Sequence, residues 1–73
     1  MEPNWEKVNE HMLTMTVKEL APIKREWFMG CLCGLSGKAA QVGEMVGQMR
    51  YWWRIGEHER AMAVLKELGY EAA

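Results

Sequence analysis

The sequence predicts an all-α protein, a small bundle of about four helices forming a single domain over residues 1–73. Apolar residues recur at three- and four-residue steps along the chain, and no stretch shows the alternation of a β-strand. Residues that cap or stop helices separate these stretches, and the connections between them are very short. A chain of this length buries only about 60% of its unfolded surface, so we expect it to self-associate or to bind a partner.

The first predicted helix begins after Asn4 and runs to about Thr14. The side chain of Asn4 can cap the free N–H groups of the first turn. Trp5, Val8 and Met12 follow at three- and four-residue steps. This spacing predicts a short amphipathic helix with one buried face.

The second predicted helix depends on a proline. Thr16 and Glu19 have the spacing of a capping box, which favours a helix start at Thr16. Pro22 has no N–H group and its ring clashes with the carbonyl four residues earlier, so we expect this first turn to break there. A new helix is expected from Pro22 until Gly34 stops it. Its apolar face comprises Ile23, Trp27, Phe28, Cys31 and Leu32.

The longest and central helix is predicted at about residues 37–55, with Ser36 as its N-cap and Gly56 as its stop. Its spacing places six apolar residues on one side: Val42, Met45, Val46, Met49, Trp52 and Trp53.

Ala40, Gly43 and Gly47 fall nearly opposite these apolar residues. A glycine in a helix interior lowers stability by about 1 kcal/mol relative to alanine, so we expect another backbone to approach closely at Gly43 and Gly47. The helix is therefore predicted to have two packing faces. A bulky residue at either glycine is expected to prevent folding or self-association.

The last helix is predicted from Glu57 to Leu68. Its apolar stripe comprises Ala61, Val64, Leu65 and Leu68. Gly69 is expected to end it, after which Tyr70 can fold back onto the bundle.

Charge and hydropathy argue against three classes of protein: nucleic-acid-binding, secreted and membrane-spanning. Nine basic and ten acidic residues give a net charge of −1, whereas domains that bind nucleic acid usually carry a basic excess. The N-terminus lacks the basic start and apolar run of a secretory signal. The uncharged apolar run WFMGCLCGL is much shorter than the roughly 20 residues needed to cross a bilayer. We expect a cytoplasmic protein without membrane contacts.

Catalytic and metal chemistry are not expected. His11, Cys31, Cys33 and His58 match a zinc site in number, but their spacing does not match that of known zinc motifs. His58 has no nucleophile or second catalytic group at a recognisable spacing. We therefore expect no enzyme activity, no metal and no cofactor.

Methionines and tryptophans suggest a protein interface. Trp52 and Trp53 are adjacent, and adjacent residues on a helix diverge by about 100°, so both are buried only if the helix is broadly covered. The predicted interface comprises Gly43, Gly47, Met49, Trp52 and Trp53. We expect a small non-enzymatic module that docks on a partner protein, in the manner of phage or mobile-element inhibitors and adaptors, and that is also able to form a homodimer.

The alternative function is nucleic-acid binding. Ser36, Gly37 and Lys38 would place N–H groups, a hydroxyl and an ammonium at a helix start, which is a general anion site. Arg50 and Arg54 follow on the same helix, and Lys24 and Arg25 are further candidates.

Two segments resemble known families. TVKEL at 16–20 and GLSGKAAQVGEMV at 34–46 resemble the SAP motif, a short helix–loop–helix DNA-binding module. The resemblance implies DNA-backbone contacts near Ser36, Gly37 and Lys38, hence a SAP-like or helix–turn–helix regulator. It also implies that Val17, Leu20 and Val42 lie in the core. Residues 50–70 resemble a single tetratricopeptide-like hairpin, which implies two helices joined at a turn glycine.

Overall fold

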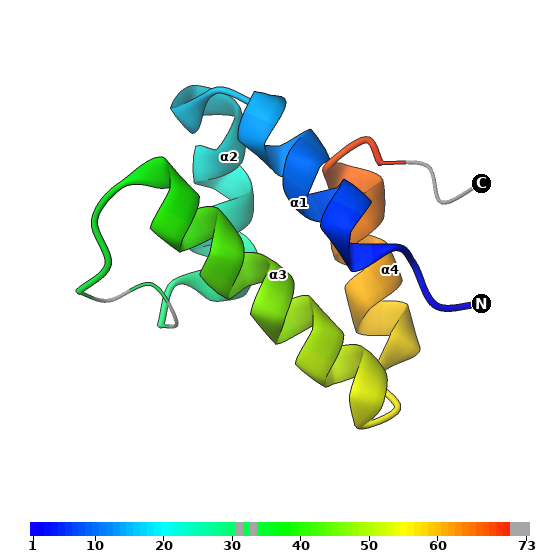
Figure 1. Cartoon of the computed structure of the whole chain (residues 1–73). Coiled ribbons are helices and arrows are strands. Elements are labelled where there is room, and N and C mark those ends of the chain that lie inside the picture. Colours follow the sequence, from blue (N-terminus) through cyan, green and yellow to red (C-terminus); the bar gives the residue numbers. More distant parts are fainter. Residues whose placement is uncertain (31, 33, 71–73) are drawn as a thin grey trace.

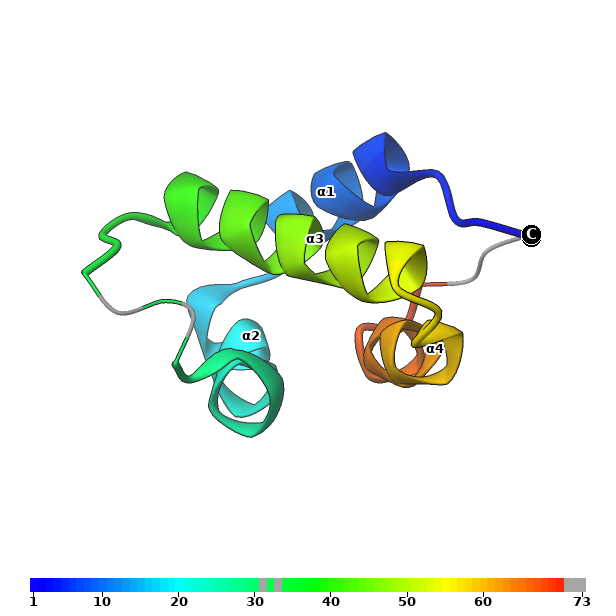
Figure 2. The same ribbon diagram turned by 90° about the horizontal axis from the view of Figure 1, so that it is seen from below.

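The computed structural model describes residues 1–30, 32 and 34–70. Within this range the regular secondary structure consists only of helices. They are α1 (Trp5–Thr14), α2 (Val17–Ile23), the π-helix η1 (Lys24–Phe28), α3 (Lys38–Arg54) and α4 (His58–Glu67). Figure 1 shows their order along the chain. In Figure 2, α3 lies in the middle, with α1 above it and α2 and α4 below it. The predicted all-α bundle with a long central helix is confirmed.

The start of α1 agrees with the prediction. The side-chain oxygen of Asn4 accepts hydrogen bonds from the N–H groups of Glu6 at 3.1 Å and Lys7 at 3.2 Å. These bonds satisfy two donors that have no partner within the helix. The predicted inner face is confirmed, since Trp5, Val8 and Met12 are buried.

The capping box at the start of α2 is also present. The N–H of Thr16 donates to the Glu19 carboxylate at 2.8 Å, and the N–H of Glu19 donates to the Thr16 hydroxyl at 3.1 Å. Each residue thus satisfies a free donor of the other.

The expected break at Pro22 is wrong. Pro22 lies inside α2, and the chain continues directly into η1. A proline cannot donate the hydrogen bond to the carbonyl four residues earlier. The chain accommodates this by widening into the five-residue bonding step of a π-helix, without breaking. Since π-helices seldom exceed a single turn, the helix ends at Phe28, and Met29 and Gly30 form a turn well before the expected stop.

Replacing Thr16 with alanine is expected to lower the stability of the protein by about 1 kcal/mol, because the cap of α2 is lost. Hydrogen bonds from the Thr16 backbone and hydroxyl also hold the pKa of Glu19 below its ordinary value of 4.5. The lowered pKa contributes stability above that ordinary value, and the contribution is lost as the pH falls through the pKa of the folded protein.

NMR titration and thermal unfolding between acidic and neutral pH test this expectation. In Thr16→Ala the pKa of Glu19 should move upward. Glu19→Gln, which does not titrate, serves as the control and should reduce the pH dependence of stability. An unchanged Glu19 pKa in Thr16→Ala would contradict the account.

The core lies on one side of α3, where α1 and α4 pack. The predicted apolar side is confirmed for the five α3 residues that are buried: Val42, Met45, Val46, Met49 and Trp52. Phe28 of η1 stacks on the Trp52 ring, with centroids 5.3 Å apart and an interplanar angle of 14°. The guanidinium carbon of Arg60 in α4 lies 4.2 Å from the centroid of the same ring. These contacts join η1, α3 and α4 around one tryptophan.

The predicted Ser36 cap of α3 is wrong. The N-cap is Gly37, whose φ of 89° lies in the left-handed region that favours glycine, and no side chain caps the helix. Because the chain turns at Gly37, the helix begins one residue later than expected and the Ser36 side chain lies outside the capping position.

The C-terminal part follows the prediction. Ala61, Val64, Leu65 and Leu68 are buried. Beyond Gly69 the chain folds back, and the N–H of Tyr70 donates to the Leu65 carbonyl at 3.1 Å. The His11 ring lies 5.7 Å from that of Tyr70, and its Nε2 is 2.8 Å from the Leu68 carbonyl oxygen. These contacts tie α1 to the end of α4.

Candidate functional site

The side of α3 that bears the two interior glycines is open. Gly43 and Gly47 are exposed, and a Cβ atom added at either would meet no atom from another part of the described chain within 4 Å. Among the described residues, the predicted second packing face is therefore wrong. Periodicity correctly placed the glycines opposite the core, but α1 and α4 both pack on the apolar side. Figure 2 shows no helix in front of α3.

The exposed Arg50 and Arg54, seven residues after Gly43 and Gly47, lie on the open side of α3. We call the uncharged residues of this side the glycine face. It comprises Ala40, Gly43, Gly47, Tyr51 and Ile55, all exposed. Tyr51 and Ile55 expose 54% and 50% of their surface. Sequence reasoning missed both, although their four-residue steps from Gly47 already placed them in line with the glycines.

Three residues of the predicted interface take other places. Met49 is fully buried and Trp52 is 5% exposed, so both belong to the chain's own core. Trp53 is partly buried, with its ring stacked on His58 at 4.0 Å and edge-on to Trp5 at 6.4 Å. Only Gly43 and Gly47 of the five lie on the glycine face.

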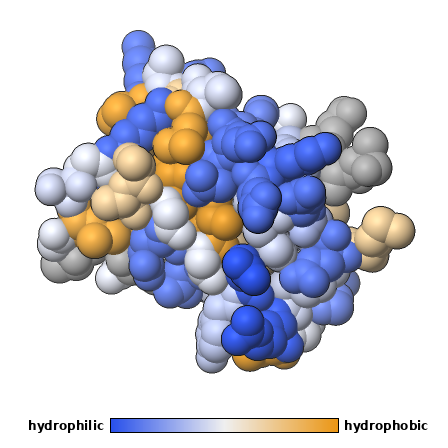
Figure 3. All heavy atoms as spheres, viewed as in Figure 1, coloured by the Kyte–Doolittle hydropathy of each residue, from blue (hydrophilic) through white to orange (hydrophobic). Residues whose placement is uncertain are grey.

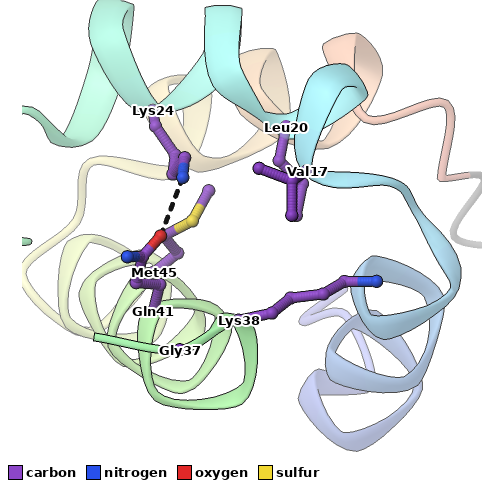
Figure 4. Close-up of a pocket in the computed structure, with 7 residues that line it drawn as sticks. All are labelled: Val17, Leu20, Lys24, Gly37, Lys38, Gln41 and Met45. Carbon is purple, nitrogen blue, oxygen red and sulfur yellow. Dashed lines mark hydrogen bonds between the residues drawn. The ribbon is translucent and has the colours of Figure 1, made fainter. Parts of the chain in front are cut away.

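In the predicted anion site at the start of α3, Lys38 makes a hydrogen bond to another helix of the chain. Its ammonium group donates to the Leu13 carbonyl oxygen at 2.7 Å, at the C-terminal end of α1. A cation at this end of a helix is stabilised by the helix dipole. Figure 4 shows the Lys38 side chain extending toward α1. Of the other predicted nucleic-acid contacts, Ser36, Gly37, Arg50 and Arg54 are exposed.

A second surface feature is a cavity of about 250 Å³, the α2–α3 hollow. In Figure 4, Val17 and Leu20 point from α2 toward α3, and Gln41 and Met45 point back. The lining residues are Val17, Leu20, Lys24, Gly37, Lys38, Gln41 and Met45. Sequence reasoning did not find this hollow, because it depends on the separation of two helices.

The candidate metal ligands do not form a cluster in the part of the chain that the structure describes. His58 Nε2 lies 3.0 Å from the Trp53 carbonyl oxygen, and His11 contacts Leu68 at the other end of α4. Cys31 and Cys33 lie outside the described residues. None of the described helices has the length and apolar character required to cross a bilayer.

Comparison of the chain with protein-family models, curated proteins and solved structures found no match. The function is therefore argued from the geometry of the glycine face and of the α2–α3 hollow.

Proposed function

We propose that the protein is a non-enzymatic module that docks on another protein through the glycine face of α3. The observation that carries the proposal is the pair Gly43 and Gly47, which lie in the interior of an exposed helix face with open space above both. Each lowers helix stability by about 1 kcal/mol relative to alanine. No part of the described chain packs into this space. Close approach of a partner's backbone would explain why glycines occupy both positions.

The other residues of the glycine face support a protein partner. Arg50 and Arg54 border these uncharged residues, and arginine is enriched where proteins bind each other. Tyr51 provides a large side chain with few rotamers, as is common where proteins bind each other. The small residues that precede it on α3 let a partner helix approach toward the short end of the usual 8–10 Å interaxial range.

The proposed role is that of a small inhibitor or adaptor of the kind that phages and other mobile elements use. A second copy of the chain is one partner that suits an exposed helix face with two glycines. Neither a cofactor nor a membrane enters this proposal.

DNA binding by a SAP-like or helix–turn–helix regulator is the alternative. Arg50 and Arg54, exposed on α3, are its remaining support on that helix. The net charge of −1 provides little attraction for phosphate.

Photo-crosslinking of the full chain in its source cells tests the proposal. Tyr51 is replaced by the crosslinking residue p-benzoylphenylalanine, and Met62 of α4, which is 42% exposed, is replaced as the matched control. We expect a discrete protein adduct from position 51, either a dimer of the chain or a second protein, and none from position 62. Nucleic acid as the only adduct, or no specific adduct, would contradict the proposal.

A further inference from the structure

The α2–α3 hollow has an apolar floor and an apolar rim. Leu20 is 2% exposed and Met45 is fully buried, and together they form its interior. At the rim, Val17 is 60% exposed. The backbone carbonyls of Leu13 and Leu35 accept hydrogen bonds from the lining residues Lys38 and Gln41. Figure 3 shows apolar side chains on the left of the molecule, over α2 and the first half of α3, and mainly hydrophilic ones on the right.

Two cations border this apolar surface. The ammonium of Lys24 donates to the side-chain oxygen of Gln41 at 2.7 Å, and that of Lys38 donates to a backbone carbonyl at 2.7 Å. Both acceptors are neutral, and each ammonium has further N–H groups to donate. The ion pair found among the described residues, Arg60 with Glu57, lies elsewhere. The first turn of α3, which follows Gly37 at the hollow, adds the positive end of a helix dipole.

Glu19 is one acidic group that interacts with Lys38. Its carboxylate already accepts the N–H of Thr16 at 2.8 Å as part of the capping box. Lys38 contributes to the lowered pKa of Glu19 less than the Thr16 hydrogen bonds do. Lys38 therefore keeps N–H groups for a carboxylate from outside the chain, as does Lys24 beside its neutral acceptor Gln41.

The size of the hollow restricts its occupant. About 250 Å³ is below the roughly 300–1,000 Å³ of typical small-molecule pockets, and suits a single large apolar side chain. We propose that the α2–α3 hollow docks an acidic peptide segment of a partner protein. The segment places one apolar side chain against Val17, above Leu20 and Met45, and places carboxylates beside Lys24 and Lys38. This site does not include the glycine face, so it stands independently of the proposed function.

Peptide titration of the full chain, followed by NMR of the Val17, Leu20 and Met45 methyl groups, tests the proposal. The probes are a short peptide with one Phe flanked by Glu residues, its counterpart with flanking Lys, and its counterpart with Gly in place of Phe. We expect the acidic Phe peptide to shift these methyl resonances with a Kd of about 0.1–1 mM. The other two peptides should bind at least about 5-fold more weakly.

Variants of the chain test separately how the lysine charges and the apolar mouth of the hollow contribute to peptide binding. Lys24→Met and Lys38→Met should each weaken binding of the acidic peptide about 2- to 5-fold, whereas Lys7→Met on exposed α1 surface should not. Val17→Glu places a carboxylate at the mouth of the hollow and should weaken binding about 10-fold or more, whereas Met62→Glu on α4 should not. Val17 is exposed at the start of a helix, where an acidic residue is tolerated, so the variant should remain folded.

Four results would overturn the proposal. These are the absence of methyl shifts up to about 1 mM peptide, equal binding of the Lys-flanked peptide, an unchanged affinity in Val17→Glu, and shifts of the same methyl groups by duplex DNA. The last result would identify the hollow as a phosphate site. None of them depends on the crosslinking outcome at position 51.

Discussion

Phe28→Ala is expected to lower the free energy of unfolding by about 3–5 kcal/mol. Phe28 is 1% exposed and stacks on Trp52, the residue that joins η1, α3 and α4. Removing its ring leaves a cavity between three elements, and the stacked partner loses its contact. A domain of this size has a total stability of only about 4–11 kcal/mol, so the loss is a large fraction.

Urea unfolding followed by circular dichroism measures this effect. Met29→Ala provides the matched control, because Met29 is the next residue in the chain and is 71% exposed. The control should change stability by no more than about 0.5 kcal/mol. If Phe28→Ala were as mild as Met29→Ala, the arrangement of η1 against α3 described above would be wrong.

The double variant Gly43→Ala/Gly47→Ala is expected to be more stable than the natural chain by about 2 kcal/mol. Both positions lie inside α3, and the added methyl groups meet no atom within 4 Å. In a domain of this length, the gain should raise the melting temperature by roughly 8–16 °C. The sequence alone predicted that a bulky residue at either glycine would prevent folding or self-association. Since space is open at both positions, we now expect the folded chain to tolerate leucine there.

Gly56→Ala is the control for the double variant. Gly56 also has open space around it, but its φ of 91° suits glycine and strains alanine, so this change should lower stability by about 1–2 kcal/mol. Opposite signs for Gly56 and the α3 pair are the expected result in thermal melts. A destabilised double variant would show that something already packs on the glycine face in solution.

Local signals in the sequence were sufficient for much of the fold. Asn4 and the Thr16–Glu19 pair act on N–H groups two or three residues away, so their spacing alone predicted the starts of α1 and α2. Pro22 was misjudged because a proline breaks a helix only if the following residues do not widen into a π-helix. At Ser36 a good capping side chain was displaced by the positive φ of Gly37.

The candidate site was less predictable for a different reason. Periodicity shows which residues share a helix face, but it does not show whether another part of the chain covers that face. It correctly placed Gly43 and Gly47 opposite Met49 and Trp52, yet it could not show that the glycines are open and that Met49 and Trp52 are buried. The α2–α3 hollow depends on how two helices are spaced, which no local pattern encodes.

Crosslinking from position 51 in the Gly43→Leu/Gly47→Leu background is the most direct test of docking through the glycine face. Circular dichroism first establishes that the variant is folded, as the open space at both positions predicts. Leucine side chains then hold a partner backbone away from α3. We predict that the yield of the protein adduct falls about 10-fold or more relative to the chain with both glycines. An adduct of the same mass and yield from the folded leucine variant would contradict the account.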